Sequence, residues 1–551
     1  MWLWDGLMID PELLVTKGLF PENLPPIFTT QQIWLPLSGK TSMTKDTVGE
    51  LCSYNSSKRG GQRRIFSLPH PFFLKEQAIF FQQHWTDIEA LFEYSPGSAS
   101  KPIIASDNAR HIHITPHSEL PKIRLKALSR YKFCLITDVS RFYYSIYTHT
   151  IPWAINGKAA AKKDFTLHST IVFGNQLDFI VRQAQSRQTI GIPVGPDSSK
   201  IISELIMSAV DKNFIERCGK NYPAYVRHVD DYWIGGHTHE DCERHLNNLR
   251  ASLKEFELDI NENKTKIIST KHIFGDSWPS EFENMLEGSM ESSRRQNSQD
   301  VLAVLGKIVD RATHDNDEGI IRHVIRVIDR QKKWTANWEI LEHFLAQCAV
   351  QFPHSLDYVA RVVAWRNRIG KPIDTGLWTE IARVATIQHS NVGRDSEVCW
   401  AMWLLKELNS KLRKSTTNTV IENSGGLVLA FLAHFAAHKM ANDSQLTEKL
   451  RDRVEGEPYG GCFWPLTLEL THLGHADPAW AKVTSAAALR LLHDAKVSII
   501  DWNAKPRVFS ELDSDHMRSE PDWEPESAIE DFGTDYEEED EDDFAHLFEN
   551  L

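Results

Sequence analysis

The chain has 551 residues, of which 41% are hydrophobic and 25% are charged, a globular composition with enough length for more than one domain. Its longest apolar stretch covers residues 427–437, and because a membrane-spanning helix needs roughly 18 apolar residues, we exclude an integral membrane protein. The seven cysteines form no CxxC pair and we see no signal peptide, so a disulfide framework is excluded and a reduced, cytoplasmic protein is expected.

The net charge of −14 is concentrated at one end of the chain. Residues 511–551 hold 18 acidic residues and one basic residue, a balance of −17, so residues 1–510 carry −14 + 17 = +3. Like charges at this density repel one another and leave little to bury, which predicts a disordered acidic tail over 511–551. The slightly basic remainder is compatible with a groove that binds nucleic acid.

Three regions precede that tail. Residues 1–280 mix short runs rich in Val, Ile, Phe and Tyr with helical patterns, which predicts an α+β domain. Residues 281–300 include a polar stretch that indicates a linker. Over 301–510, apolar residues recur at helical spacing between short turns, which predicts an all-α domain of stacked antiparallel pairs, a HEAT-like helical repeat. Because no fixed period is visible, an irregular helical bundle is the alternative.

The first segment of functional interest is polar and basic. Residues 58–64, KRGGQRR, indicate a flexible loop that contacts a nucleic-acid backbone, with an ordinary surface loop as an equal alternative. The neighbouring Tyr54 also lies in a polar segment, which we expect to be mobile.

Further along the chain, an apolar strand is predicted to end at a carboxylate. Residues 130–137 read RYKFCLIT and are followed by Asp138 and then by the aromatic segment 142–147. Residues 188–199 are rich in Gly and Pro and precede a predicted helix over 200–211. The glycines allow a base pair or a backbone to approach this loop closely.

Two adjacent carboxylates, Asp230 and Asp231, stand between two β-rich runs, as at the turn of a β-hairpin. Alone, such a pair is usually a solvated turn. Together with Asp138 on a neighbouring strand, it supplies the carboxylates that hold two Mg²⁺ ions for phosphoryl transfer to a hydroxyl. Lys264, in a later loop, is a candidate phosphate contact. The pattern therefore indicates metal-dependent phosphoryl transfer.

In this order and spacing, the four segments resemble motifs A, B, C and D of reverse transcriptase palms. DVSRFY at 138–143 matches motif A, PVG at 193–195 matches motif B, and HVDD at 228–231 matches motif C. Three longer strings are similar to those of bacterial abortive-infection and defence-associated reverse transcriptases. They are FYYSIYTHTIPW at 142–153, QTIGIPVGP at 188–196 and GLFPENLPP at 18–26.

This resemblance implies the fingers and palm of a right-hand polymerase in residues 1–280, followed by the helical-repeat domain that such relatives carry. It implies an RNA-directed DNA polymerase of antiphage defence that adds deoxynucleoside triphosphates (dNTPs) with two Mg²⁺ ions, or with Mn²⁺ as a substitute. The template is either an RNA, such as a partner non-coding RNA, or absent, with DNA synthesis starting at a tyrosine hydroxyl, for which Tyr54 is the candidate. The family also suggests a second defence protein as a partner and a homo-oligomer.

Carried over position by position, the resemblance assigns metal binding to Asp138, Asp230 and Asp231, assisted by the carbonyl of Val139. The residues that it places against the dNTP or the nascent base pair are Arg110, Arg130, Tyr143, Pro193, Gly195 and Lys264.

Two positions depart from the family pattern. His228 replaces a tyrosine that grips the primer end, and Val194 replaces a glutamine beside the template. Both argue against faithful, processive copying, and neither touches the metal site. The alternative function is a non-catalytic scaffold with a vestigial palm, against which the intact carboxylates argue.

Overall fold

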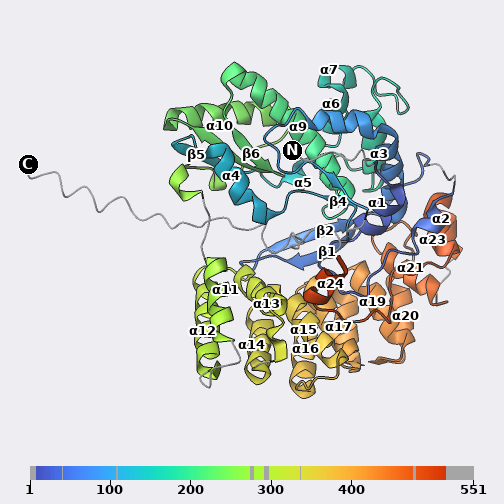
Figure 1. Cartoon of the computed structure of the whole chain (residues 1–551). Helices are drawn as coiled ribbons and strands as arrows, with labels where there is room; N and C mark the ends of the chain where they lie inside the picture. The colour runs from blue at the N-terminus through green and yellow to red at the C-terminus, as the bar shows by residue number, and fades with distance from the viewer. Residues whose placement is uncertain are drawn as a thin grey trace, which may run out of the picture.

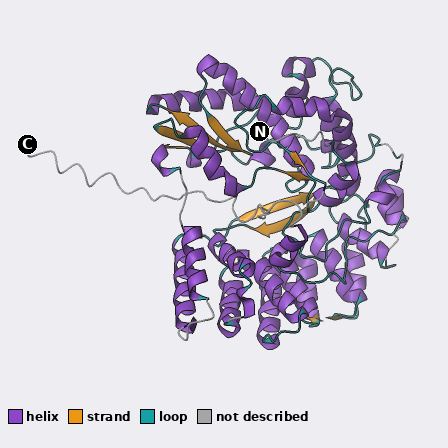
Figure 2. Ribbon diagram, viewed as in Figure 1, coloured by secondary structure: helices purple, strands orange, loops and turns teal. Residues whose placement is uncertain are grey.

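The computed structural model describes residues 8–39, 41, 43–106, 109–273, 278–290, 297–335, 337–475 and 479–516. An α+β region ends at residue 273, and an almost wholly helical region follows from residue 278 (Figures 1 and 2). The predicted succession of an α+β fold and a helical region is therefore confirmed. Within the described ranges, no helix combines the length and the apolar character needed to cross a bilayer.

A four-stranded antiparallel sheet forms the centre of the α+β region, in the strand order β6, β7, β5, β8. The strands are β5 (Phe133–Thr137), β6 (Tyr225–His228), β7 (Asp231–Gly236) and β8 (Lys266–Ser269). Successive side chains of β7 point to opposite faces of the sheet. The hydroxyl of Tyr232 donates to Asp211 on one face, whereas Trp233 lies under the guanidinium of Arg124 on the other. Helices therefore cover both faces.

Helices make up most of the rest of the α+β region. They are α1 (Pro11–Gly18), α2 (Trp34–Leu37), α3 (Pro71–Phe92), α4 (Leu120–Leu128), α5 (Phe142–Ser145), α6 (Thr150–Asn156), α7 (Lys158–Ala161), α8 (Gly174–Gln183), α9 (Asp197–Cys218) and α10 (His239–Lys254). A capping box starts α10, because Thr238 Oγ1 accepts from the Asp241 N–H and the Asp241 carboxylate accepts from the Thr238 N–H, both at 3.1 Å.

Two small hairpins complete the α+β region. One pairs β3 (Ile103–Ile104) with β4 (Ile112–His113). The other pairs β1 (Cys52–Ser57) with β2 (Arg63–Leu68) and lies between the four-stranded sheet and the helical region (Figure 1). We refer to β1, β2 and their turn as the β1–β2 hairpin. Residues 58–64, predicted to be a flexible loop, are its turn and the start of β2.

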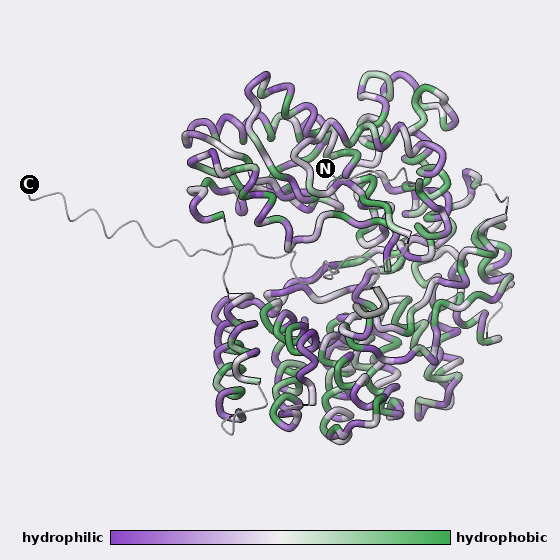
Figure 3. The backbone as a smooth tube through the Cα atoms, viewed as in Figure 1, coloured by the Kyte–Doolittle hydropathy of each residue, from purple (hydrophilic) through white to green (hydrophobic). Residues whose placement is uncertain are grey.

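The helices of the second region stack in two rows. They are α11 (Trp278–Ser289), α12 (Asn297–His314), α13 (Gly319–Arg330), α14 (Trp338–Gln351), α15 (Leu356–Arg368), α16 (Thr375–Ser390), α17 (Asp395–Glu407), α18 (Lys414–Asn423), α19 (Gly426–Ala437), α20 (Leu446–Arg453), α21 (Trp464–His472), α22 (Ala479–Thr484), α23 (Ala487–Asp494) and α24 (Phe509–His516). Odd-numbered helices from α11 to α21 each contact the next odd one, and even-numbered helices from α12 to α20 do the same. Green and purple stretches alternate along these helices in Figure 3, as expected of helices with one apolar face.

Two predicted boundaries are wrong. The predicted linker over 281–300 is helical on both sides of residues 291–296, which lie outside the described residues. Phe282 and Leu286 lie one turn apart on α11 and are buried, and α12 already begins at Asn297. The predicted tail begins too early, because α24 packs Phe509 against Tyr358 with 4.5 Å between ring centroids and pairs Glu511 with Arg368 at 2.7 Å. The rest of the predicted tail, residues 517–551, lies outside the described residues.

Trp403 tests how far the helical region depends on its buried aromatic side chains. Its ring is fully buried and meets Trp400 edge to face at 5.2 Å. We expect Trp403→Ala to lower the free energy of unfolding by about 3–5 kcal/mol, because a large cavity replaces the indole. Urea denaturation followed by circular dichroism measures this. Leu35→Ala, at a position that is 82% exposed, is the control and should change stability by less than about 0.5 kcal/mol.

Candidate active site

The three carboxylates expected to hold metal ions meet at one edge of the sheet. Asp138 directly follows β5, and Asp231 is the first residue of β7. The antiparallel register pairs Thr137 with Tyr232, so the next residues along the two strands, Asp138 and Asp231, reach the same edge. Asp230 occupies the turn between β6 and β7. All three carboxylates line one cavity of about 340 Å³, which we call the catalytic cavity.

The two carboxylate oxygens of Asp138 have different surroundings. Asp138 is only 7% exposed, and its Oδ2 accepts from Nζ of Lys264 at 3.0 Å. Its Oδ1 is buried and has no hydrogen-bond partner among the residues that the structure describes. A buried carboxylate oxygen without a donor favours a cation beside it. Because Mg²⁺ takes oxygen ligands, Asp138 suits such an ion, and Asp230 and Asp231 offer further carboxylates in the same cavity.

The turn that carries Asp230 has an unusual backbone conformation. Val229 has a φ of +56°, in the left-handed region that β-branched residues rarely adopt. Two polar contacts hold it there: its N–H donates to Ser100 Oγ at 2.5 Å, and its carbonyl accepts from Nη1 of Arg227 at 3.0 Å. Such strain persists only where the surroundings enforce it. The turn is therefore fixed from both sides.

Arg227 is itself held by a buried ion network behind the turn. Its guanidinium donates to Glu204 through Nη1 and Nη2, both at 2.9 Å, and to Asp211 through Nε at 2.8 Å. All three side chains are buried. Burial alone would lower the pKa of Arg227, but Asp211 and Glu204 outweigh it and raise that pKa well above its usual value. Arg227 therefore stays charged.

The sequence analysis missed this network, although a signal for it exists. Glu204 and Asp211 are seven residues apart in α9, so they lie on the same face of the helix. Two acidic residues on one face of a helix that also carries buried Ile, Leu, Met and Val indicate a buried cationic partner.

The glycine- and proline-rich segment lines the catalytic cavity next to the β1–β2 hairpin. Gly195 has a φ of +117°, and a Cβ on it would lie 3.0 Å from the ring of Phe66 on β2. Gly195 and Val194 both line the catalytic cavity. Pro193 is buried and is not among the described residues that line it.

Arg110 has a different environment from the one expected of a free cation that binds triphosphate. It is 5% exposed, and its guanidinium donates to Asp197 at the start of α9 at 2.8 and 2.5 Å and to the carbonyl of Phe20 at 2.8 Å. Although Arg110 lines the catalytic cavity, these bonds tie its charge to α9 and fix the segment before that helix.

Three more of the expected residues line the catalytic cavity: Tyr143, His228 and Lys264. The hydroxyl of Tyr143 lies 3.4 Å from Ser203 Oγ. His228 is buried, with Nε2 3.0 Å from the carbonyl of Thr115 and its ring against His117. The side chain of Lys264 is 61% exposed and pairs with Asp138. Val139 is buried and is not among the described lining residues.

Two predicted positions are wrong. Arg130 lies before β5, at the opposite end of this strand from Asp138, and stacks on Tyr131. A strand rises about 3.3 Å per residue, so the two ends cannot serve one site. Tyr54 is not in a mobile segment but in β1, fully buried among residues of the helical region, where burial raises the pKa of its hydroxyl well above the usual value. Its Ser- and Asn-rich strand looks polar because only alternate residues face the core.

Cations surround the carboxylates in the catalytic cavity, and several come from the β1–β2 hairpin. The lining cations are Lys58, Arg63, Arg64, Arg110, Arg141, Lys200 and Lys264. A cavity lined by carboxylates together with arginines and lysines suits a ligand that combines a divalent metal with several phosphates.

Residues 58–306 match the family model described as "Reverse transcriptase (RNA-dependent DNA polymerase)". This part of the chain is therefore similar to reverse transcriptase domains. The matched residues include all three carboxylates at the sheet edge, the glycine- and proline-rich segment and β2. No curated protein matches the chain.

Solved structures similar to the chain include three of telomerase from Candida. Apo telomerase from Candida tropicalis truncated from its C-terminal domain is 14% identical, with a TM-score of 0.29, and the match covers 44% of this chain and 56% of that one. Telomerase from Candida albicans with a TWJ fragment of telomeric RNA is 13% identical, with a TM-score of 0.29 and 66% of each chain covered. Apo telomerase from Candida tropicalis is 12% identical, with a TM-score of 0.29, and the match covers 74% of this chain and 71% of that one. At these TM-scores the matches add nothing about activity.

The buried ion network gives a stability prediction. Arg227→Met leaves Glu204 and Asp211 buried without their cation, so we expect it to lower the free energy of unfolding by about 3–5 kcal/mol. The triple variant Arg227→Met, Glu204→Gln, Asp211→Asn removes all the charges and should recover part of that loss. Thermal or urea denaturation measures both.

Arg244→Met serves as the control for loss of an arginine. Arg244 pairs with Asp241 at the surface and is 64% exposed, so its loss should cost less than about 1 kcal/mol. A similar small loss for Arg227→Met would contradict the importance of the buried network.

Proposed function

We propose that the chain is a reverse-transcriptase-type DNA polymerase that adds dNTPs to a hydroxyl by metal-dependent phosphoryl transfer. One observation carries this proposal. The strand register brings Asp138 and Asp231 to one edge of the sheet, Asp230 lines the same cavity, and lysines and arginines surround them. Metal-dependent phosphoryl transfer needs carboxylates that hold the metal ions and cations that bind the phosphates.

Asp138, Asp230 and Asp231 would hold two Mg²⁺ ions, or Mn²⁺ in their place, with the Val139 carbonyl as a further ligand. When bound, the ions lower the charge on the attacking and leaving oxygens. Lys264, beside Asp138, would bind the triphosphate of the incoming dNTP. Tyr143 would exclude the ribose 2′-hydroxyl, while Gly195, Val194 and His228 would contact the nascent base pair and the primer end.

The biological setting that we propose is antiphage defence in the cytoplasm. The motif strings that resemble abortive-infection reverse transcriptases support it, as does the helical region after the palm, whose two rows we propose to be HEAT-like repeats. The template would be an RNA, such as a partner non-coding RNA, or synthesis would proceed without one. A homo-oligomer and a second defence protein belong to the same proposal.

If synthesis starts from a protein hydroxyl, the starting residue must reach the catalytic cavity. Tyr54 is enclosed by the helical region and does not meet this requirement as folded. The described tyrosines that line the cavity are Tyr143 and Tyr144. A protein-primed mode would therefore involve one of these or a residue from another molecule.

Asp230→Asn tests the proposed chemistry. We expect purified protein with Mg²⁺ to incorporate labelled dNTP, and the variant to lose incorporation on the order of 10³-fold or more, because a metal ligand is weakened. Removal of Mg²⁺ with EDTA should have the same effect and be reversed by Mg²⁺ or Mn²⁺. Products treated with proteinase and with RNase before denaturing gels distinguish a protein primer from an RNA template.

Asp87→Asn, at an exposed position on α3, is the matched control and should retain full activity. Incorporation that survives Asp230→Asn would contradict the polymerase proposal. Absence of both incorporation and Mg²⁺–dNTP binding in the unaltered protein would favour the non-catalytic scaffold.

A further inference from the structure

The β1–β2 hairpin forms a two-stranded sheet of its own. An isolated hairpin is marginally stable in water and needs packing against other elements. Figures 1 and 2 show it between the four-stranded sheet and the helical region. Its stability and its position therefore depend on what those two neighbours contribute.

Helix α17 holds the middle of the hairpin. Asp395 Oδ2 accepts from the backbone N–H of Asn55 at 2.9 Å, and Glu397 accepts from both terminal nitrogens of Arg63 at 2.5 and 3.0 Å. The side chain of Glu397 is 1% exposed, so this ion pair is shielded from water on one side. Gly425 brings the helical backbone close, because a Cβ on it would lie 2.8 Å from the carbonyl oxygen of Ser53.

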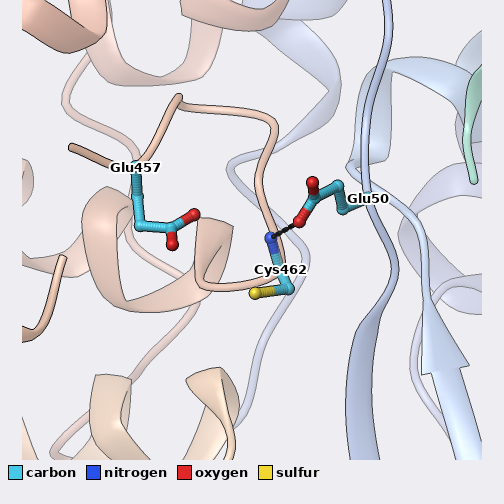
Figure 4. A group of neighbouring side chains, drawn as sticks. All are labelled: Glu50, Glu457 and Cys462. Carbon is cyan, nitrogen blue, oxygen red and sulfur yellow. Dashed lines mark hydrogen bonds between the residues drawn. The ribbon is translucent and has the colours of Figure 1, made fainter. Parts of the chain in front are cut away.

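Other parts of the helical region hold the two ends of the hairpin. At the turn, Arg59 pairs with Asp317 at 3.0 Å, and the hydroxyl of Ser57 lies 3.0 Å from Nδ1 of His354. At the open end, the backbone N–H of Cys462 donates to Glu50 at 3.2 Å, close to Glu457 (Figure 4). The Trp464 indole also donates to the carbonyl of Leu68 at 3.2 Å. The helical region thus holds the hairpin along its whole length.

The opposite side of the hairpin contacts the catalytic cavity. The Ser67 N–H donates to the carbonyl of Val194 at 2.9 Å, and the hydroxyl of Tyr144 donates to the carbonyl of Ile65 at 2.8 Å. The hairpin residues that line the cavity are Lys58, Gln62, Arg63, Arg64 and Phe66. A shift of the hairpin would therefore move several cations relative to the carboxylates.

We propose that Asp395 and Glu397 are positioning residues that act through the hairpin to set the geometry of the dNTP site. This inference rests on the proposed polymerase function and adds a role for the helical region. Neither carboxylate is among the described residues that line the catalytic cavity. They fix Asn55 and Arg63, and through them the side chains that face the triphosphate. The helical region is then a structural part of the active site.

Glu397→Gln is the first test, because it removes the charge and keeps the shape. We expect kcat/KM for dNTP to fall roughly tenfold or more, mainly through a higher KM, because small misplacement of binding groups is costly. Hydrogen exchange over residues 52–68 should become faster, a readout that does not require activity. Glu407→Gln, on the same helix but paired with Lys406, should change neither quantity.

Exchange of the two charges of an ion pair distinguishes loss of the hairpin's position from general misfolding. Arg59→Asp and Asp317→Arg should each raise the KM for dNTP and speed exchange in the hairpin, and the double variant should restore both. Their side chains are 18% and 13% exposed. Because solvent reaches the pair, we expect the acidic and basic residues to be interchangeable between the two positions. Failure of the double variant to recover would overturn the inference.

The outcomes separate this inference from the proposed function. If the unaltered protein incorporates dNTP but Glu397→Gln leaves KM and exchange unchanged, the positioning role is wrong. A higher KM with unchanged exchange would also overturn it, because the effect would then be electrostatic. If the unaltered protein neither incorporates nor binds dNTP, the polymerase proposal fails, while the exchange data still report whether α17 holds the hairpin.

Discussion

The guanidinium of Arg227, buried between Glu204 and Asp211, is the constraint on which the candidate site depends. Because the network is closed to water, its charges have no alternative partners, and the position of Arg227 is fixed. That position in turn holds the carbonyl of Val229 and the strained turn that carries Asp230. The buried ion network thus fixes the backbone of the turn that carries Asp230.

The position of the β1–β2 hairpin, which also lines the catalytic cavity, is likewise fixed by residues outside that cavity. As a two-stranded sheet, it is only marginally stable by itself. Polar contacts join it and the residues beside it to α17, to the turn after α12 and to the loop before α21. The same strands contribute cations and Phe66 to the cavity wall. The helical region and the catalytic cavity therefore share one structural element, and a variant in either is expected to affect the other.

The charge distribution of the catalytic cavity suits a ligand that carries both signs of charge. Asp138, Asp230 and Asp231 repel one another unless cations lie nearby, and the lysines and arginines of the walls would repel one another equally. Lys264 partly satisfies Asp138, but Oδ1 of that residue lacks a donor among the described residues. A metal ion bound together with phosphates would neutralise both sets of charges.

By itself, the sequence determined the α+β region followed by helices, and it singled out Asp138, Asp230, Asp231, Gly195 and Lys264, because strand periodicity, turn chemistry and carboxylate spacing are local properties. It could not place Arg130, Tyr54 or Arg110, whose surroundings come from residues distant in the chain. A polar strand such as β1 is indistinguishable from a loop until a partner covers alternate side chains, and a cation is free or paired only once its neighbours are known. The sequence also indicates, by the spacing of Glu204 and Asp211 on α9, that these two residues need a cationic partner, but only the tertiary structure identifies Arg227 as that partner. The tertiary structure alone decided that the helical region supports the hairpin, because ion pairs such as Arg63–Glu397 and Arg59–Asp317 join residues hundreds of positions apart and leave no pattern in the local sequence.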